Sequence, residues 1–161
     1  MRKPKIYKIK DSVGNIKEIK YDVLTNNFRQ EFNLPSELKT YGFNFDVVSK
    51  FSSSNGIGDL NVIEYFYFGF GCTKYKFQNS CSFRSILTQN SKSSIQYLIE
   101  YHMSYDYIGL ISTEKTFLKD NQNLITISKK THNYSLKTKL NSFKETIKII
   151  QPISEITETY D

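Results

Sequence analysis

The first twenty-one residues alternate apolar and charged side chains in the way that a strand with two different faces requires. In the run KIYKIK, Tyr7 and Ile9 alternate with Lys8 and Lys10, and a second run, IKEIKY, continues the pattern after residues 11–15. Successive side chains of a β-strand point to opposite faces, so one face of each run is apolar and the other is cationic. We therefore predict a β-hairpin with its turn at residues 11–15.

Helical spacing is predicted in three later segments. The stretch DVLTNNFRQEF spaces its apolar residues for a short helix that begins near Asp22, and Pro35 with Ser36 favours the start of a second helix. A third helix is predicted near the C-terminus, capped by Ser135 and ended before Pro152. Either it is solvated and docked by its apolar stripe, or it also contacts RNA or a neighbouring protein. The stripe consists of Leu136, Leu140, Phe143, Ile147 and Ile150.

Short strand-like runs occupy the middle of the chain, after a loop predicted at residues 52–60. One of them, predicted as a buried strand at 107–112, would deliver Ser112 and Thr113 to its end. Helices first and short strands afterwards predict an α+β fold. The strand-like runs are residues 63–71, 73–77, 82–89, 95–102, 107–112 and 124–130.

The charge of the chain favours an anionic partner. Lys and Arg total 22 against 16 Asp and Glu, which gives +6 at pH 7 and a pI near 9.1. This balance suits a polyanion such as nucleic acid, and a basic domain without such a partner stays open as the alternative. No apolar run reaches the length of a membrane span, so no membrane partner is expected. The absence of alanine and tryptophan indicates an AT-rich genome, and the lack of alanine favours strands.

Motifs for catalysis or metal binding are missing from the sequence. Cys72 and Cys81 lie in a predicted strand pair, and we expect small buried thiols rather than a bridge. His102 and His132 have no partner at a metal-ligand spacing, so no zinc site is predicted. Neither a phosphate-binding glycine loop, nor a nucleophile motif, nor a paired-carboxylate signature occurs. We expect no enzyme activity and no cofactor.

Three short stretches, taken in order, carry a family resemblance, and a fourth at 83–97 adds to it more weakly. DVLT at 22–25 is similar to an Asp-x-Leu-Thr motif that starts a first helix, and LPSELK at 34–39 is similar to a Pro-Ser-Lys-Leu-Lys stretch that leads into a second. YDYIGLISTEKTFLKD at 105–120 resembles a hydrophobic strand followed by a Ser-Thr-Ser-Lys-Gly signature. FRSILTQNSKSSIQY at 83–97 resembles a strand followed by Ser-basic-Pro-Gly. The family that these stretches resemble is the eighth protein of the bacterial small ribosomal subunit.

The resemblance implies an α/β lobe and a β-rich lobe that rest on the central domain of small-subunit ribosomal RNA. Hydroxyls of Ser112 and Thr113 would bind ribose and phosphate, and Glu114 would pair with Lys115 or Lys119. In the alternative, the two hydroxyls only satisfy a turn. The implied RNA-binding residues are Thr25, Arg29, Lys39, Arg84, Ser91, Lys92, Ser112, Thr113 and Lys115.

The expected organisation has four segments. They are a basic N-terminal hairpin (1–21), a small N-terminal α/β lobe (22–70), a β-rich RNA-binding lobe (71–130) and a C-terminal helical extension with an acidic tail (131–161).

A structural constituent of a small ribosomal subunit is the leading functional hypothesis. The AT-rich composition places that ribosome in the mitochondrial matrix, with the protein encoded by the organelle, and the terminal extensions would contact neighbouring ribosomal proteins. Two alternatives stay open: a phage protein that blocks a host factor, and a remnant homing endonuclease from a mobile element. The endonuclease alternative would need converging carboxylates for metal ions.

Overall fold

Every element of the described chain is a β-strand. A computed structural model describes residues 5–23, 38–39, 46–54, 59–73, 81–104, 106–120, 123–143 and 146–160, and no helix occurs in these ranges. The strands are β1 Lys8–Lys10, β2 Ile16–Val23, β3 Leu38–Lys39, β4 Asp46–Ser54, β5 Leu60–Thr73, β6 Cys81–Asn90, β7 Ile95–Tyr101, β8 Ile111–Asp120, β9 Asn123–Leu140 and β10 Thr146–Thr159.

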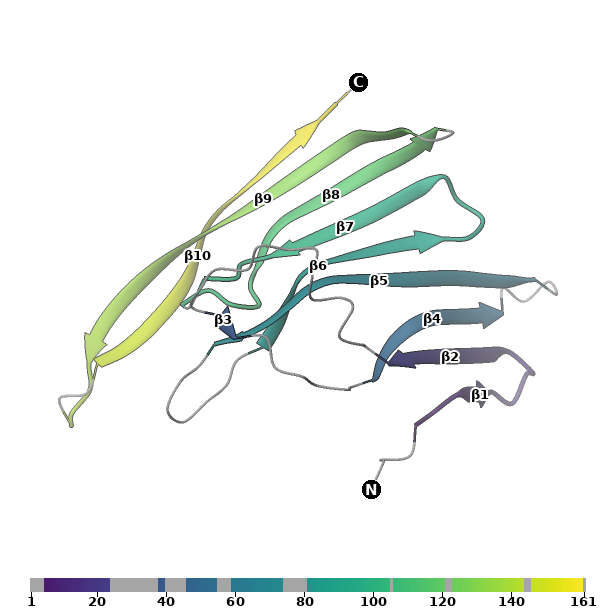
Figure 1. Cartoon of the computed structure of the whole chain (residues 1–161), viewed down its shortest axis with the longest axis horizontal. Helices are drawn as coiled ribbons and strands as arrows, with labels where there is room; N and C mark the ends of the chain where they lie inside the picture. Colours follow the sequence, from purple (N-terminus) through teal and green to yellow (C-terminus); the bar gives the residue numbers. More distant parts are fainter. Residues whose placement is uncertain are drawn as a thin grey trace.

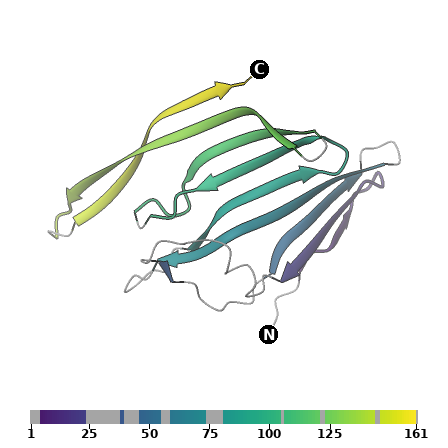
Figure 2. The same cartoon turned by 45° about the horizontal axis from the view of Figure 1, so that its top comes forward.

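The strands form one antiparallel sheet in which neighbours along the chain are neighbours in space. The strand order is β1-β2-β4-β5-β6-β7-β8-β9-β10, with the two-residue strand β3 paired to the end of β5. Figures 1 and 2 show a single twisted and curved layer whose two edges are β1 and β10. The described strands contact only their partners in the sheet, so no described strand packs across either face.

The predicted α+β class is therefore wrong, and the C-terminal helix is its largest error. The described residues of this segment, 131–143 and 146–150, lie in β9, in a turn at residues 141–143 and in β10. Many of these residues are Thr or Ile, whose branched side chains fit a pleated sheet better than a helix. Leu136 and Leu140 also lie at an even interval on β9, as do Ile147 and Ile149 on β10. Pro152 does not end a helix; it lies in the edge strand, where a missing N–H is tolerated.

Several smaller predictions are also corrected. Asp22 and Val23 end strand β2 instead of starting a helix, and the predicted loop at 52–60 contains the end of β4 and the start of β5. The predicted strand at 107–112 is a turn up to residue 110, and β8 begins at Ile111. The rest of the first helix and the Pro35 helix start lie outside the described residues, as does most of the run at 73–77.

The N-terminal hairpin is present as its alternation predicts. Strand β1 pairs with β2 in a register that joins Ile9 to Lys17. The turn is held by Asp11, whose carboxylate accepts hydrogen bonds from the backbone N–H groups of Val13 (3.1 Å) and Asn15 (2.8 Å). The side-chain amide of Asn15 adds a further bond, and these bonds lower the pKa of Asp11. Gly14 supplies the left-handed backbone conformation (φ 90°) that the turn needs.

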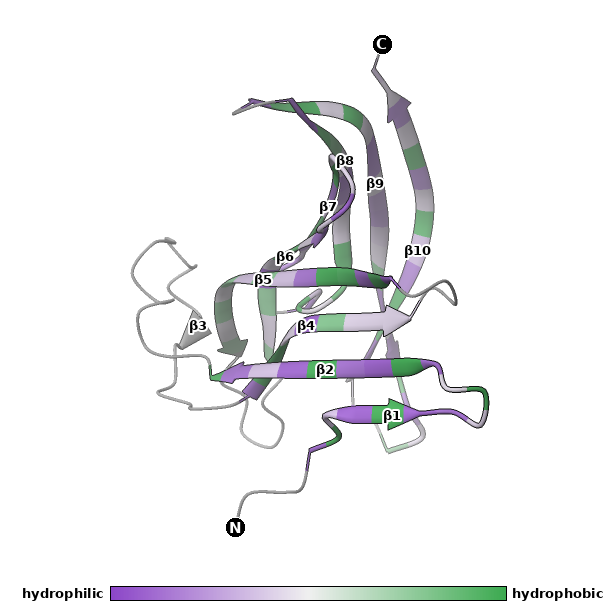
Figure 3. Cartoon of the chain, turned by 90° about the vertical axis from the view of Figure 1, so that its right-hand side faces the viewer, coloured by the Kyte–Doolittle hydropathy of each residue, from purple (hydrophilic) through white to green (hydrophobic). Residues whose placement is uncertain are grey.

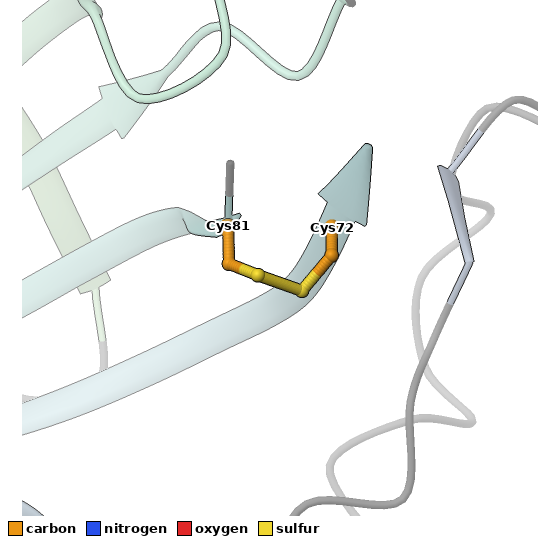
Figure 4. Close-up of a disulfide and its surroundings, with 2 residues drawn as sticks. All are labelled: Cys72 and Cys81. Atoms are coloured by element: carbon orange, nitrogen blue, oxygen red, sulfur yellow. A yellow bond between two sulfur atoms is a disulfide. The ribbon is translucent and has the colours of Figure 1, made fainter. Parts of the chain in front are cut away.

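A disulfide joins Cys72 to Cys81, which corrects the expectation of two free thiols (Figure 4). The two cysteines are directly opposite each other at the end of β5 and the start of β6, with their Cα atoms 4.0 Å apart. Nearby, Gly69 has φ 60°, and a Cβ atom there would lie 2.8 Å from the Cβ atom of Arg84. Glycine is therefore required where β5 bends toward the bridge.

Little of the described chain is fully buried. Cys72 and Met103 are its buried apolar residues, and Ser52 and Gln96 are its buried polar ones. The Gln96 amide donates a hydrogen bond of 2.9 Å to Gln89 on the neighbouring strand, which satisfies one buried polar group. Most other strand residues are half-buried, as expected for a sheet without a second described layer.

Candidate nucleic-acid interface

The strand register assigns every paired side chain to one of the two faces of the sheet. Directly paired residues share a face, and successive residues alternate between faces except at bulges. Figure 3 shows this alternation as apolar and polar bands that follow one another along β10. Ion pairs between strand residues agree with the assignment, because Lys8–Glu18, Lys115–Glu100 and similar pairs each join residues of one face.

One face, which we call the lysine face, carries most of the strand lysines. The strand pairing traces this face from β2 to β9 through Glu18, Lys50, Gln89, Leu98, Lys115 and Lys129. The lysines outnumber the acidic residues of the same face, which are Glu18, Asp22, Glu64, Glu100 and Glu158. The lysines of this face are Lys8, Lys10, Lys20, Lys50, Lys115, Lys119, Lys129, Lys137 and Lys139.

The opposite face, which we call the apolar face, is aliphatic and aromatic at its centre. Its charges do not favour one sign: Asp46, Glu114, Asp120 and Glu155 balance Lys17, Lys130 and Lys148. The residues that define it are Ile9, Ile19, Tyr21, Phe51, Ile63, Tyr65, Tyr67, Ile86, Tyr97 and Ile99.

Two pairs of lysines on the lysine face are directly opposite each other on adjacent strands. Lys20 pairs with Lys50, and Lys115 pairs with Lys129. Like charges in this position destabilise a sheet unless carboxylates neutralise them. Lys115 and Lys129 each form a close ion pair, with Glu100 at 2.7 Å and with Glu158 at 3.2 Å. Lys20 reaches its carboxylate at 4.0 Å and Lys50 at 3.5 Å. Lys20 and Lys50 also line two adjoining hollows, of about 360 and 400 Å³, which leave room for an anion beside them.

The lysine face extends onto a ribbon that projects from the sheet. Strand β9 pairs with β8 only as far as Thr131, so residues 132–140 pair with β10 alone (Figure 1). Lys137 and Lys139 are exposed on this ribbon and form no ion pair with a described residue. From Lys129 to Lys139 the lysine face covers about 33 Å of strand. At the base of the ribbon, Glu158 raises the pKa of Lys129, which keeps its ammonium group charged.

The predicted site at Ser112, Thr113 and Lys115 lies at the start of β8 rather than at the end of a strand. The Ser112 hydroxyl donates a hydrogen bond of 3.0 Å to the carbonyl of Glu100, so it serves the sheet itself. Thr113 and Lys115 are on the lysine face, and Lys115 forms an ion pair of 2.7 Å with Glu100. Glu114 is on the apolar face and contacts His132 at 2.6 Å, not Lys115 or Lys119 as predicted.

The other predicted site residues are not gathered with these. Ser91 and Lys92 lie in the β6–β7 turn, and Lys92 pairs with Asp59 at 2.7 Å, which lowers the pKa of Asp59. Arg84 is exposed on β6 beside Gly69. Lys39 belongs to β3, where its backbone pairs with Cys72. Thr25 and Arg29 lie outside the described residues.

Most residues of the lysine face were absent from the predicted site. A signal for part of it exists in the sequence: Lys8 and Lys10, like Lys137 and Lys139, are two apart, which is the spacing of one face of a strand. The predicted hairpin uses this spacing, and Lys8 and Lys10 lie on its predicted cationic face. The predicted C-terminal helix includes Lys137 and Lys139, and residues two apart do not share a face of a helix.

Both histidines of the chain lie near the base of the ribbon. His132 contacts the carboxylates of Glu114 and Glu155, at 2.6 and 3.6 Å. His102 contacts the rings of Tyr107 and Tyr134, which also contact each other. Its Nε2 atom is shielded from solvent and has no hydrogen-bond partner among the described residues, and burial lowers the pKa of His102. Among the residues described, no group of three or more His, Cys, Asp or Glu side chains is arranged to hold a metal ion.

No helix with the length and apolar character of a membrane crossing occurs in the described parts of the chain.

Comparison with protein-family models, with curated proteins and with solved structures finds no match to this chain.

Proposed function

We propose that this chain is a structural RNA-binding protein that contacts RNA through its lysine face. The observation that carries the proposal is the segregation of charge between the two faces. A single sheet places most of its strand lysines on one side, including two directly opposed pairs, of which Lys20 and Lys50 have only distant carboxylates to offset their repulsion. Phosphates bound between opposed ammonium groups would remove that repulsion, and each neutralised phosphate adds affinity by releasing counterions.

Hydroxyl groups between the lysines favour RNA as the polyanion. Thr113, Thr131 and Ser135 lie on the same face, between Lys115, Lys129 and the ribbon lysines. Hydroxyls of this kind bond to ribose 2′-hydroxyl groups and phosphate oxygens, which recognises the shape of a folded RNA more than its base sequence.

The test compares two double variants with the same net charge. Lys137→Gln with Lys139→Gln removes charge from the lysine face, and Lys17→Gln with Lys130→Gln removes it from the apolar face. Binding to a structured RNA hairpin is measured by fluorescence anisotropy over a series of salt concentrations. The lysine-face variant should lose about 1.4–1.8 from the log–log salt slope and about 30-fold in affinity at about 0.1 M salt.

The matched apolar-face variant should keep the slope and affinity of the unmodified protein. Equal losses in the two variants would show that only net charge matters, and the lysine face would then have no special role. Failure of the unmodified protein to bind the hairpin would reject RNA binding altogether.

A place in a mitochondrial small ribosomal subunit is a narrower proposal that rests on the sequence resemblance alone. The helices that the family resemblance implies for an α/β lobe are not found in the described chain. The Cys72–Cys81 bridge is typical of a protein from an oxidising compartment. Co-sedimentation of the chain with small subunits in high salt tests this proposal. Loss of the chain from the subunit fraction would remove it and leave the RNA-binding proposal intact.

A further inference from the structure

The longest open edge of the sheet is strand β10. Among the described strands it contacts only β9, and nearly all of its residues are exposed. An open edge presents backbone N–H and C=O groups in the pattern that a further strand needs. The opposite edge, β1, has only three residues, so β10 is the surface on which a second chain would find most partners.

The middle of β10 breaks this edge into two halves. Pro152 has no N–H group, and the pairing with β9 shifts between Pro152 and Ser154, where Ile153 forms a bulge. A proline in an antiparallel strand occupies a position where the backbone N–H would point away from the paired strand, here β9. Backbone groups alternate in direction along a strand, so those of Lys148 and Thr146, at even intervals from Pro152, also point outward, away from β9. Proline and bulge together prevent one long uninterrupted ladder.

Beyond the bulge the outward positions shift by one residue. The N–H group of Tyr160 donates inward to the carbonyl of Ile127, 3.0 Å away. Because backbone groups alternate in direction along the strand, those of Thr157 and Glu155 point outward, away from β9. The outward residues are thus Thr146 and Lys148 in the first half of the strand, and Glu155 and Thr157 in the second.

We propose that β10 pairs with β10 of a second copy of this chain, antiparallel, about a two-fold axis between Gln151 and Pro152. In that register Lys148 lies opposite the partner's Glu155, and Thr146 opposite the partner's Thr157. The backbone N–H and C=O groups of all four residues point outward, so those of one β10 strand face those of the other and can form hydrogen bonds. In both copies Pro152 and the bulge lie at the two-fold axis, where they interrupt neither of the two hydrogen-bond ladders on its two sides.

Side chains match in the same register. Lys148 and Glu155 have opposite charge and lie on the apolar face, whereas Ile147 and Ile156, which are 45% and 53% exposed, become neighbours on the lysine face. Face matching depends on the bulge, because an unbulged strand in this register would place opposite faces together. The pairing is isologous, as in a closed dimer, and turns both lysine faces to the same side. It involves no residue on which the RNA proposal depends.

Charge reversal tests the register in solution. In Lys148→Glu and in Glu155→Lys, each two-fold contact joins like charges, whereas an equimolar mixture of the two variants can form a heterodimer in which every contact joins opposite charges. The unmodified protein should have about twice the mass of 18.9 kDa by light scattering. Each variant alone should dissociate at a concentration about tenfold higher or more, and the mixture should recover the dimer.

Contacts within each chain do not confuse this result. Lys148 also contacts Asp106, and Glu155 also contacts Lys130, but these internal contacts are changed equally in each variant alone and in the mixture. Circular dichroism of each variant confirms the fold before mixing. A monomeric unmodified protein, single variants that stay fully dimeric, or a mixture that stays dissociated would each overturn the proposal.

Discussion

The two faces of this sheet share the same strands and differ in what they do with their side chains. The apolar face packs Ile, Phe and Tyr side chains against their neighbours on adjacent strands, which stabilises the sheet. The lysine face also has an apolar centre, in which Phe66, Leu87 and Leu98 lie side by side. It differs in its charge, because it places Lys20 opposite Lys50 with the nearest carboxylates 4.0 and 3.5 Å away. The difference between the two faces is therefore one of charge: the lysine face carries an excess of lysine, and the apolar face does not.

The largest effect should come from the covalent link that holds both faces in one sheet. Replacing Cys72 and Cys81 by serine opens a short loop and should lower the free energy of unfolding by about 2–3 kcal/mol. Urea denaturation with and without reductant measures this loss, and the double variant should no longer respond to reductant. RNA affinity of the folded fraction should stay unchanged, because the bridge carries no charge and lies at the ends of β5 and β6. An equal response to reductant in both proteins would contradict the role of the bridge.

A side chain of the apolar face should matter for stability and not for RNA. Ile86 pairs with Ile99 across two central strands and is half-buried. Ile86→Ala should cost about 1–2 kcal/mol in urea denaturation, less than the loss at a fully buried site. Its RNA affinity, measured on folded protein, should equal that of the unmodified chain. A loss of affinity without a loss of stability would reverse the assignment of the two faces.

Acid should weaken the apolar face and leave the lysine face charged. Burial lowers the pKa of His102 below that of the unfolded chain, so the unfolded state takes up the proton first and stability falls as pH drops below about 6.5. His102→Gln should therefore lose less stability than the unmodified protein between about pH 7 and pH 5.5. Thermal unfolding across this range measures the difference. The same pH dependence of stability in His102→Gln and in the unmodified protein would contradict this role of His102.

The smallest effect should be a gain in stability on the lysine face. Lys20→Gln removes the repulsion from Lys50 and gives up only a distant contact with Asp22, so the sheet should become more stable by about 0.2–0.5 kcal/mol. The same change should lower the salt slope of RNA binding by about 0.7–0.9. Lys17→Gln, on the apolar face, is the matched control. A loss of stability in Lys20→Gln would mean that its repulsion is already neutralised within the chain.

The sequence by itself determined the local pattern of much of this protein. Alternation around Lys8, Ile9, Ile19 and Lys20 is compatible only with a strand, so the N-terminal hairpin and its two faces could be predicted. The strand-like runs at 82–89, 95–102 and 124–130 were found for the same reason. The C-terminal segment was not, because the spacing of Leu136 and Leu140 satisfies a helical period as well as a strand period, and pairing with a partner strand decides between them.

Only the tertiary structure decided which residues meet. A face of the whole sheet depends on the register of each strand pair and on the bulges that shift it, and neither can be read from one strand alone. Register placed Lys115 opposite Lys129 and Cys72 opposite Cys81, which turned scattered lysines into one face and two predicted thiols into a bridge. The physical reason is that alternation fixes side-chain direction within a strand, whereas hydrogen bonding between strands fixes which side chains become neighbours.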